Sequence, residues 1–121
     1  MLFQGFETDG SNAMDPATFR DALARLIESV RRDLRAAQLP IVFGELPAGF
    51  VASFPERVAI RDEVLRAPEA FPYIAVASSR IPVAAEDDGL HYSTAGLLAI
   101  GERYAPALAL ADANALADPV A

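Results

Sequence analysis

The sequence contains no cysteine, which excludes disulfide bonds and metal sites built from thiolate ligands. It also has no uninterrupted apolar run of the roughly 18–20 residues that a membrane-spanning helix requires. Positive charge is scarce, because 17 Asp and Glu residues outnumber ten Lys and Arg residues and the formal charge is −7. Nucleic acids and anionic membranes are unfavourable partners for such a chain, and we expect it to bind neither.

Two sequence signals are missing as well. No basic segment followed by an apolar one opens the chain, so no signal peptide is visible and the sequence predicts no compartment. No glycine-rich phosphate loop is present, which argues against a nucleotide-binding half-domain.

What the chain does have is a high apolar content and a regular alternation of patterns. Hydrophobic residues make up 53% of the sequence, which suggests strands buried on both faces or a surface covered by something else. The patterns predict the order strand, helix, strand, helix, strand, helix. This order is typical of a parallel α/β sheet with right-handed crossovers. Three strands make a small sheet, so we expect part of it to be supplied elsewhere. The predicted strands are 2–4, 41–46 and 73–77, and the predicted helices are 15–37, 54–66 and 93–106.

Local signals place the ends of these elements. Asp15 followed by Pro16 is a good helix start, and Ser93 is a plausible cap of the last helix. Residues 67–68 are expected to end the second helix, and Pro106 is expected to kink or end the last one. We expect loops at 5–14 and 47–53, and an alanine-rich tail at 107–121 with one further helical turn before a frayed end. The apolar face of the last helix is predicted to contain Leu97, Ile100, Tyr104 and Leu108.

The first 14 residues have two interpretations. Residues 2–5 (LFQG) resemble a protease-site remnant, and residues 11–14 (SNAM) resemble a cloning scar. However, the residues before Ser11 are not the protease site that such a scar would follow. We therefore favour the native interpretation, in which residues 2–4 end a strand and residues 5–14 form a polar loop.

The only histidine, His91, lies three residues after Asp88 in the segment between the last strand and the last helix. An Asp and a His on one short turn can act as a general base and the group that orients it. In parallel α/β folds, functional loops follow the carboxyl ends of strands, as this one does. The alternative is a structural histidine capped by a local carboxylate. Asp87 is the other acid that could take the place of Asp88 beside His91.

The residues around this pair resemble a known family. Residues 88–96 (DGLHYSTAG) and 101–105 (GERYA) look like the C-terminal block of SGNH-type carbohydrate esterases, closest to sialate O-acetylesterase and acetylxylan-esterase-like enzymes. Residues 4–9 (QGFETD) resemble that family's Gln-Gly-Glu-Ser/Thr-Asp block with Phe6 inserted. The resemblance spans about residues 2–106. It implies a three-layer flavodoxin-like parallel sheet that is incomplete and lacks the N-terminal strands, with 1–106 as the C-terminal portion of the esterase domain.

The resemblance also implies roles for individual residues. His91 would be the general base that deprotonates a serine, and Asp88 would fix its tautomer. Gln4 would offer its side-chain amide to the oxyanion, with Gly5 allowing close approach. Glu7 and Asp9 would brace that loop. An acetylated carbohydrate would be the substrate, with no metal and no cofactor.

One departure from the family is large. The nucleophile there lies in a Gly-Asp-Ser block, and none of the 121 residues form one. Turn and cap roles explain Ser11, Ser78, Ser79 and Ser93 better than a nucleophilic role does. We therefore expect the chain to be inactive alone and to need the missing N-terminal half. The alternative is a non-catalytic α/β module that binds a glycan or a protein partner, or self-associates through an uncovered sheet edge.

Overall fold

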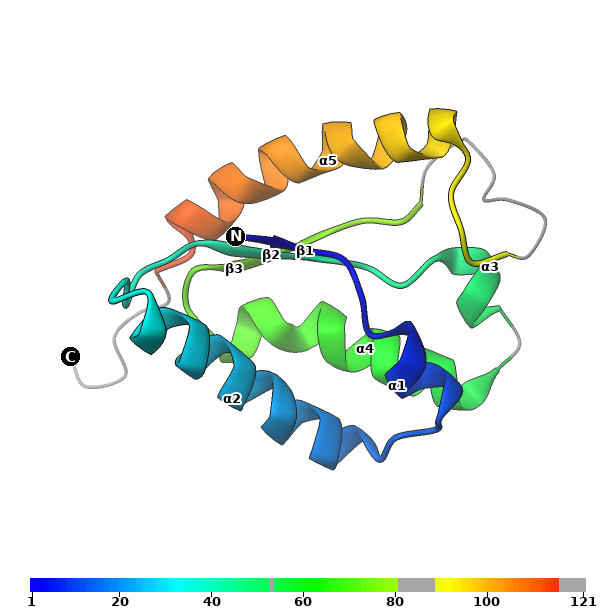
Figure 1. The fold of residues 1–121 in the computed structure, drawn as a ribbon, viewed down its shortest axis with the longest axis horizontal. Coiled ribbons are helices and arrows are strands. Elements are labelled where there is room, and N and C mark those ends of the chain that lie inside the picture. The colour runs from blue at the N-terminus through cyan, green and yellow to red at the C-terminus, as the bar shows by residue number, and fades with distance from the viewer. Residues whose placement is uncertain (53, 81–88, 116–121) are drawn as a thin grey trace.

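A computed structural model describes residues 1–52, 54–80 and 89–115. It confirms an α/β fold built on a small parallel sheet of three strands in the order β1-β2-β3. The strands are β1 (Leu2–Phe3), β2 (Ile41–Gly44) and β3 (Ile74–Ala77). Phe3 pairs with Phe43, which in turn pairs with Val76. Helices cover both faces of this sheet, with α5 on one side and α2 and α4 on the other (Figure 1).

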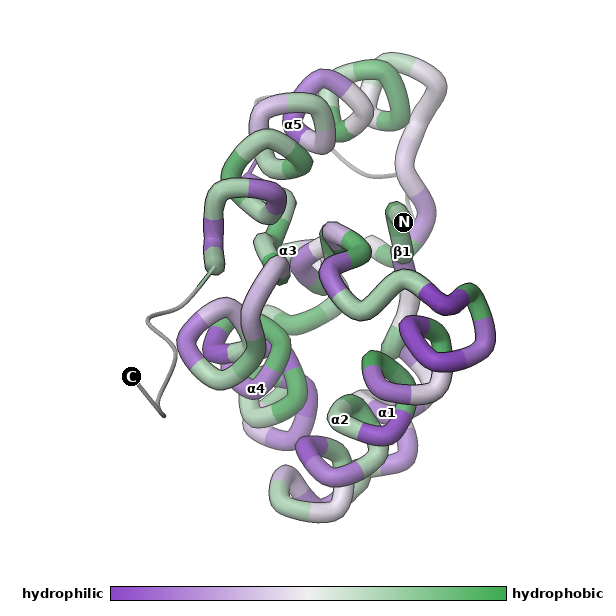
Figure 2. The backbone as a smooth tube through the Cα atoms, turned by 90° about the vertical axis from the view of Figure 1, so that its left-hand side faces the viewer, coloured by the Kyte–Doolittle hydropathy of each residue, from purple (hydrophilic) through white to green (hydrophobic). Residues whose placement is uncertain are grey.

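The central strand β2 shows why the sheet needs a helix layer on each face. All four of its residues are buried, and successive side chains point to opposite faces. Phe43 joins the larger apolar cluster with α2 and α4, whereas Val42 joins a smaller cluster with alanines of β3 and α5. Figure 2, turned by 90°, shows α5 separated from α2 and α4 by the strands. The continuous apolar run at 41–44 is thus a strand buried on both faces, as predicted.

The first long helix, α2 (Pro16–Asp33), begins as predicted and ends early. The Asp15 carboxylate accepts a hydrogen bond from the Thr18 backbone N–H at 2.9 Å, which caps its first turn. The predicted end near residue 37 is wrong, because Arg35 adopts a left-handed conformation with φ of 52°. The Ala36 N–H then donates to the Arg31 carbonyl at 2.9 Å and closes the last turn.

Two short helices lie where loops were predicted, α1 (Glu7–Ser11) and α3 (Ala48–Val51). Both are too short to show a helical apolar period, and contacts with α4 hold them in place. Arg57 of α4 stacks on the Phe50 ring at 4.2 Å and donates to the Phe50 carbonyl at 2.9 Å. The sequence could not indicate these helices, because their stability comes from neighbours distant in the chain.

The helix α4 (Pro55–Ala70) continues through Pro68, so the predicted end at residues 67–68 is wrong. A proline in the last turn removes only one backbone hydrogen bond, and the Phe71 N–H restores the helical pattern by donating to the Ala67 carbonyl at 2.9 Å. The Pro68 carbonyl accepts from the Asn114 side chain at 3.1 Å, which ties the end of α4 to the end of α5.

The last helix, α5 (Thr94–Ala113), starts at the predicted cap, where Ser93 Oγ accepts from the Gly96 N–H at 3.1 Å. It does not end at Pro106, and the helical part of the predicted tail is longer than the one turn expected, since residues 107–113 are all helical. Ala107 and Ala111 are buried against β2 and β3, because small side chains let the helix approach the sheet. The predicted apolar face is only partly correct, since Leu97 and Leu108 are exposed. No helix of the described residues is long and apolar enough to cross a membrane.

Candidate active site

The candidate site lies at the carboxyl ends of the three parallel strands. Gln4 follows β1, Glu45 follows β2, and Ser78 and Ser79 follow β3. The helices α1 and α3 and the start of α5 gather around the same end of the sheet (Figure 1). Parallel α/β folds bind their ligands at this end of the sheet.

A pocket of about 300 Å³ at the carboxyl end of the sheet brings Gln4 and His91 together. Glu7, Leu90 and Tyr92 complete its lining. Gln4 and His91 come from opposite ends of the chain, and both were predicted as site residues. Asp88 lies outside the described residues, so its pairing with His91 stays a prediction.

The Gln4 side chain is held by two neighbouring elements. Its Oε1 accepts a hydrogen bond from the Tyr104 hydroxyl of α5 at 2.7 Å. Its Nε2 donates to the Glu45 carbonyl, at the end of β2, over a longer 3.5 Å. Gly44 has no side chain to obstruct the contact between Gln4 and Tyr104. A Cβ at this position would overlap the Gln4 amide and the Tyr104 hydroxyl. Tyr104 of α5 and the residues at the end of β2 therefore set where the amide lies.

Gly5 has a packing reason to be glycine. A Cβ at this position would lie 2.8 Å from Cε1 of the Phe3 ring, too close for an ordinary contact. Gly5 is not among the residues that line the pocket with Gln4. Its predicted part in oxyanion binding remains a prediction.

Glu45 links the ends of β2 and β3. Only 5% of this residue is exposed, and its carboxylate accepts from the Ser79 N–H at 3.0 Å and the Ser78 hydroxyl at 3.3 Å. The Ser79 hydroxyl donates to the Leu46 carbonyl at 3.0 Å. These serines hold the two strand ends together.

Two tyrosines lie close to Gln4 with their hydroxyls in the neutral form, Tyr92 in the pocket lining and Tyr104 in contact with the Gln4 amide. Burial, helped by Tyr92 and Glu7, raises the pKa of Tyr104 to about 12. Burial also raises the pKa of Tyr92, with Glu45 and Glu7 adding to the effect. The Tyr92 hydroxyl is buried and has no hydrogen-bond partner within the described part of the chain. Both phenols therefore keep their protons at neutral pH.

The family model described as "Carbohydrate esterase, sialic acid-specific acetylesterase" matches residues 1–110. The chain belongs to this carbohydrate esterase family. The match spans all three strands and most of α5, and it includes the pocket that contains Gln4 and His91. No curated protein and no solved structure matches the chain.

Three residues around the candidate site were not predicted as site residues: Gly44, Glu45 and Tyr104. The signal for Tyr104 was its place in residues 101–105, one of the segments that carry the family resemblance. Periodicity instead assigned it to the apolar face of the last helix. Gly44 and Glu45 end a buried strand, which is a recognised position for site residues in parallel sheets.

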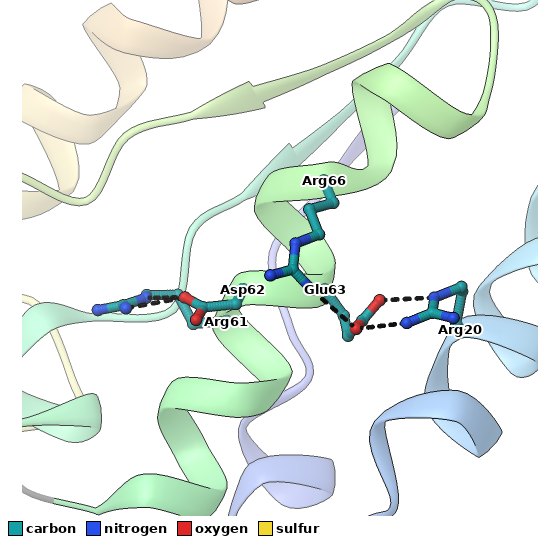
Figure 3. Close-up of polar contacts among 5 residues, drawn as sticks. All are labelled: Arg20, Arg61, Asp62, Glu63 and Arg66. Carbon is teal, nitrogen blue, oxygen red and sulfur yellow. Dashed lines mark hydrogen bonds and ion pairs between the residues drawn. The ribbon is translucent and has the colours of Figure 1, made fainter.

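A second polar cluster lies away from the pocket that contains Gln4 and His91, between α2 and α4 (Figure 3). Glu63, 5% exposed, accepts two hydrogen bonds from Arg20 at 2.8 Å and 2.7 Å and one from Arg66 at 3.4 Å. The hydrogen bonds from Arg20 lower the pKa of Glu63. This cluster joins the two helices and is remote from the strand ends, so we interpret it as structural.

The described residues contain no group of three or more His, Cys, Asp or Glu side chains that could hold a metal ion. The prediction that the site needs no metal stays a prediction, because Asp87 and Asp88 lie outside those residues.

Proposed function

We propose that the chain supplies the histidine and the oxyanion-binding amide of a carbohydrate O-acetylesterase. The observation that carries this proposal is the pocket that Gln4 and His91 share at the carboxyl ends of the strands. The family match supports the reaction class and the acetylated sugar as substrate. In this proposal Asp88 orients His91, and no metal or cofactor takes part.

The chemistry follows from the side chains. A serine hydroxyl attacks the acetyl carbonyl while His91 takes its proton, and the Gln4 Nε2–H stabilises the negative oxygen that forms. His91 then gives the proton to the leaving sugar hydroxyl, which leaves an acetyl-serine. Water, deprotonated by His91, attacks that ester and releases acetate.

The serine must come from another segment, because the 121 residues contain no Gly-Asp-Ser block. The sheet offers a place for such a segment beside β1, which is an edge strand of the sheet formed by the described residues. Leu2 on this edge strand is 56% exposed, and Leu97, which lines the same surface pocket as Leu2, is 59% exposed. A parallel strand added there would end next to Gln4. We propose that the chain is the C-terminal part of an SGNH-type sheet completed in this way.

Reconstitution tests the proposal. The chain is combined with a segment that carries the Gly-Asp-Ser block, taken from a longer member of the same family, and acetate release from an O-acetylated sialic acid is measured. We expect turnover by the combination and none by either part alone. Loss of turnover when the serine of that block is replaced by alanine identifies the nucleophile. Turnover by the chain alone would contradict the assignment of the serine to another segment.

The alternative is a non-catalytic module that binds a glycan or a protein partner. The exposed leucines favour it, since Leu2, Leu97, Leu98 and Leu110 are each more than half exposed. Native mass spectrometry of the chain separates the two functions when combined with the reconstitution assay. Stable self-association without any recovered esterase activity would favour the non-catalytic module.

A further inference from the structure

The contact between Tyr104 and Gln4 has a direction that matters for chemistry. A carboxamide has a donor end and an acceptor end, and only the nitrogen can stabilise an oxyanion. The Tyr104 hydroxyl contacts the oxygen end at 2.7 Å, and the Glu45 carbonyl contacts the nitrogen end at 3.5 Å. Rotating the amide by 180° would place its oxygen against the Glu45 carbonyl, where two acceptors repel. The Glu45 carbonyl, which can only accept, therefore selects the orientation, and the Tyr104 hydroxyl then holds the oxygen end in place by donating to it.

From this geometry we infer that Tyr104 is a positioning residue, which holds the Gln4 carboxamide with its nitrogen available as the oxyanion donor. The inference rests on the proposed function for the role of Gln4, and it goes beyond it in assigning Tyr104 to the esterase machinery. Tyr104 itself contacts no reacting atom in this scheme.

Packing holds the tyrosine and the glutamine in place. Tyr104 packs against the small apolar cluster formed by β2, β3 and α5, which fixes its ring. Gly44 provides the space in which the hydroxyl and the amide meet, since a methyl group there would overlap both. The raised pKa of Tyr104, about 12, keeps the hydroxyl protonated and able to donate throughout the pH range of an esterase assay.

Nuclear magnetic resonance on the chain tests the contact without requiring catalysis. The sequence has only four carboxamide side chains, those of Asn12, Asn114, Gln4 and Gln38, so the Gln4 signals can be assigned individually. In Tyr104→Phe we expect the Gln4 side-chain signals to shift while those of Gln38 stay in place. Tyr73→Phe, just before β3 at the far end of the sheet, is the matched control and should leave Gln4 unchanged. Unchanged Gln4 signals in folded Tyr104→Phe would overturn the inference.

A second measurement covers the case in which Tyr104→Phe does not fold. In the chain with 3-fluorotyrosine in place of tyrosine, the phenols ionise at lower pH. The Gln4 side-chain carbonyl carbon should then titrate together with the fluorine signal of residue 104. A Gln4 signal that does not follow that ionisation would overturn the inference.

Kinetics in the reconstituted esterase separate this inference from the proposed function. We expect Tyr104→Phe to lower kcat about tenfold with KM little changed, because a misoriented donor affects the transition state more than substrate binding. A shifted Gln4 signal with unchanged kcat would support the contact but overturn the oxyanion role of Gln4. Both readouts unchanged would overturn the positioning role of Tyr104.

Discussion

The backbone N–H of Ser79 donates to the carboxylate of Glu45 over 3.0 Å and links the ends of two neighbouring strands. Glu45 is buried at the point where β2 leaves the sheet, directly after Gly44 and beside the pocket. We expect Glu45→Ala to destabilise the chain by about 1–3 kcal/mol, because the Ser79 N–H loses its acceptor inside the protein. Urea unfolding measures this change. Glu102→Ala, on the exposed side of α5, is the control and should have little effect.

Gly44 and Gly101 make a matched pair of glycines in neighbouring elements. A Cβ at Gly44 would overlap the Gln4 amide and the Tyr104 hydroxyl, whereas a Cβ at Gly101 meets nothing within 4 Å. We expect Gly44→Ala to cost about 1–3 kcal/mol through overpacking. Gly101→Ala should stabilise α5 by about 1 kcal/mol, because alanine favours the helix more than glycine does. Thermal unfolding of both variants tests the pair, and equal effects would contradict the close packing at Gly44.

Ionisation of Tyr104 should limit stability at high pH. Its pKa is raised from the ordinary value of 10.0 to about 12 in the folded chain. The unfolded chain therefore releases this proton first, so stability is fully present below pH 10 and is lost as the pH rises from 10 to about 12. Titration of phenolate absorbance should show a transition near pH 12 that disappears in Tyr104→Phe. A transition near 10 for this residue would contradict its burial.

The Glu63 carboxylate should make the chain less stable at low pH, whereas Tyr104 does so at high pH. Its pKa is lowered from 4.5 by hydrogen bonds from Arg20, so its contribution is present above pH 4.5 and is lost as the pH falls through the lowered value. Glu63→Gln should reduce both the stability at neutral pH and its loss in acid. Asp33→Asn, which breaks an exposed ion pair with Arg32, is the control. Urea midpoints are measured between pH 3 and 7. An equal fall of the midpoint with acid in both variants would contradict the role of Glu63.

The alternation of apolar strands and amphipathic helices was sufficient to predict the parallel sheet. Strong local signals also located the starts of α2 at Asp15 and of α5 at Ser93. The extents of the helices were less predictable, because Pro68 and Pro106 sit in helices whose other contacts outweigh one lost hydrogen bond. Helices α1 and α3 depend on packing against α4, which no local pattern reveals.

For the site, the sequence predicted Gln4 and His91 but not the residues that hold the Gln4 amide in place. Both residues lie in segments that carry the family resemblance. Gln4 lies at the end of the first predicted strand, and His91 lies just before the last predicted helix. The spacing of Tyr104 on the last helix matches a core residue, and only the fold shows its hydroxyl against Gln4. Gly44 gave no signal of its own, because its role is the space it leaves for two side chains from elsewhere.

The central claim is that Gln4 and His91 of this chain work in one esterase site. The most direct measurement is kcat for acetate release by the reconstituted esterase with substitutions at these two positions. We predict a loss of at least about 10³-fold in His91→Ala and of about 10²-fold in Gln4→Ala. Gln38→Ala, which removes an exposed glutamine before the start of β2, should retain full activity. Full activity in His91→Ala would contradict the account.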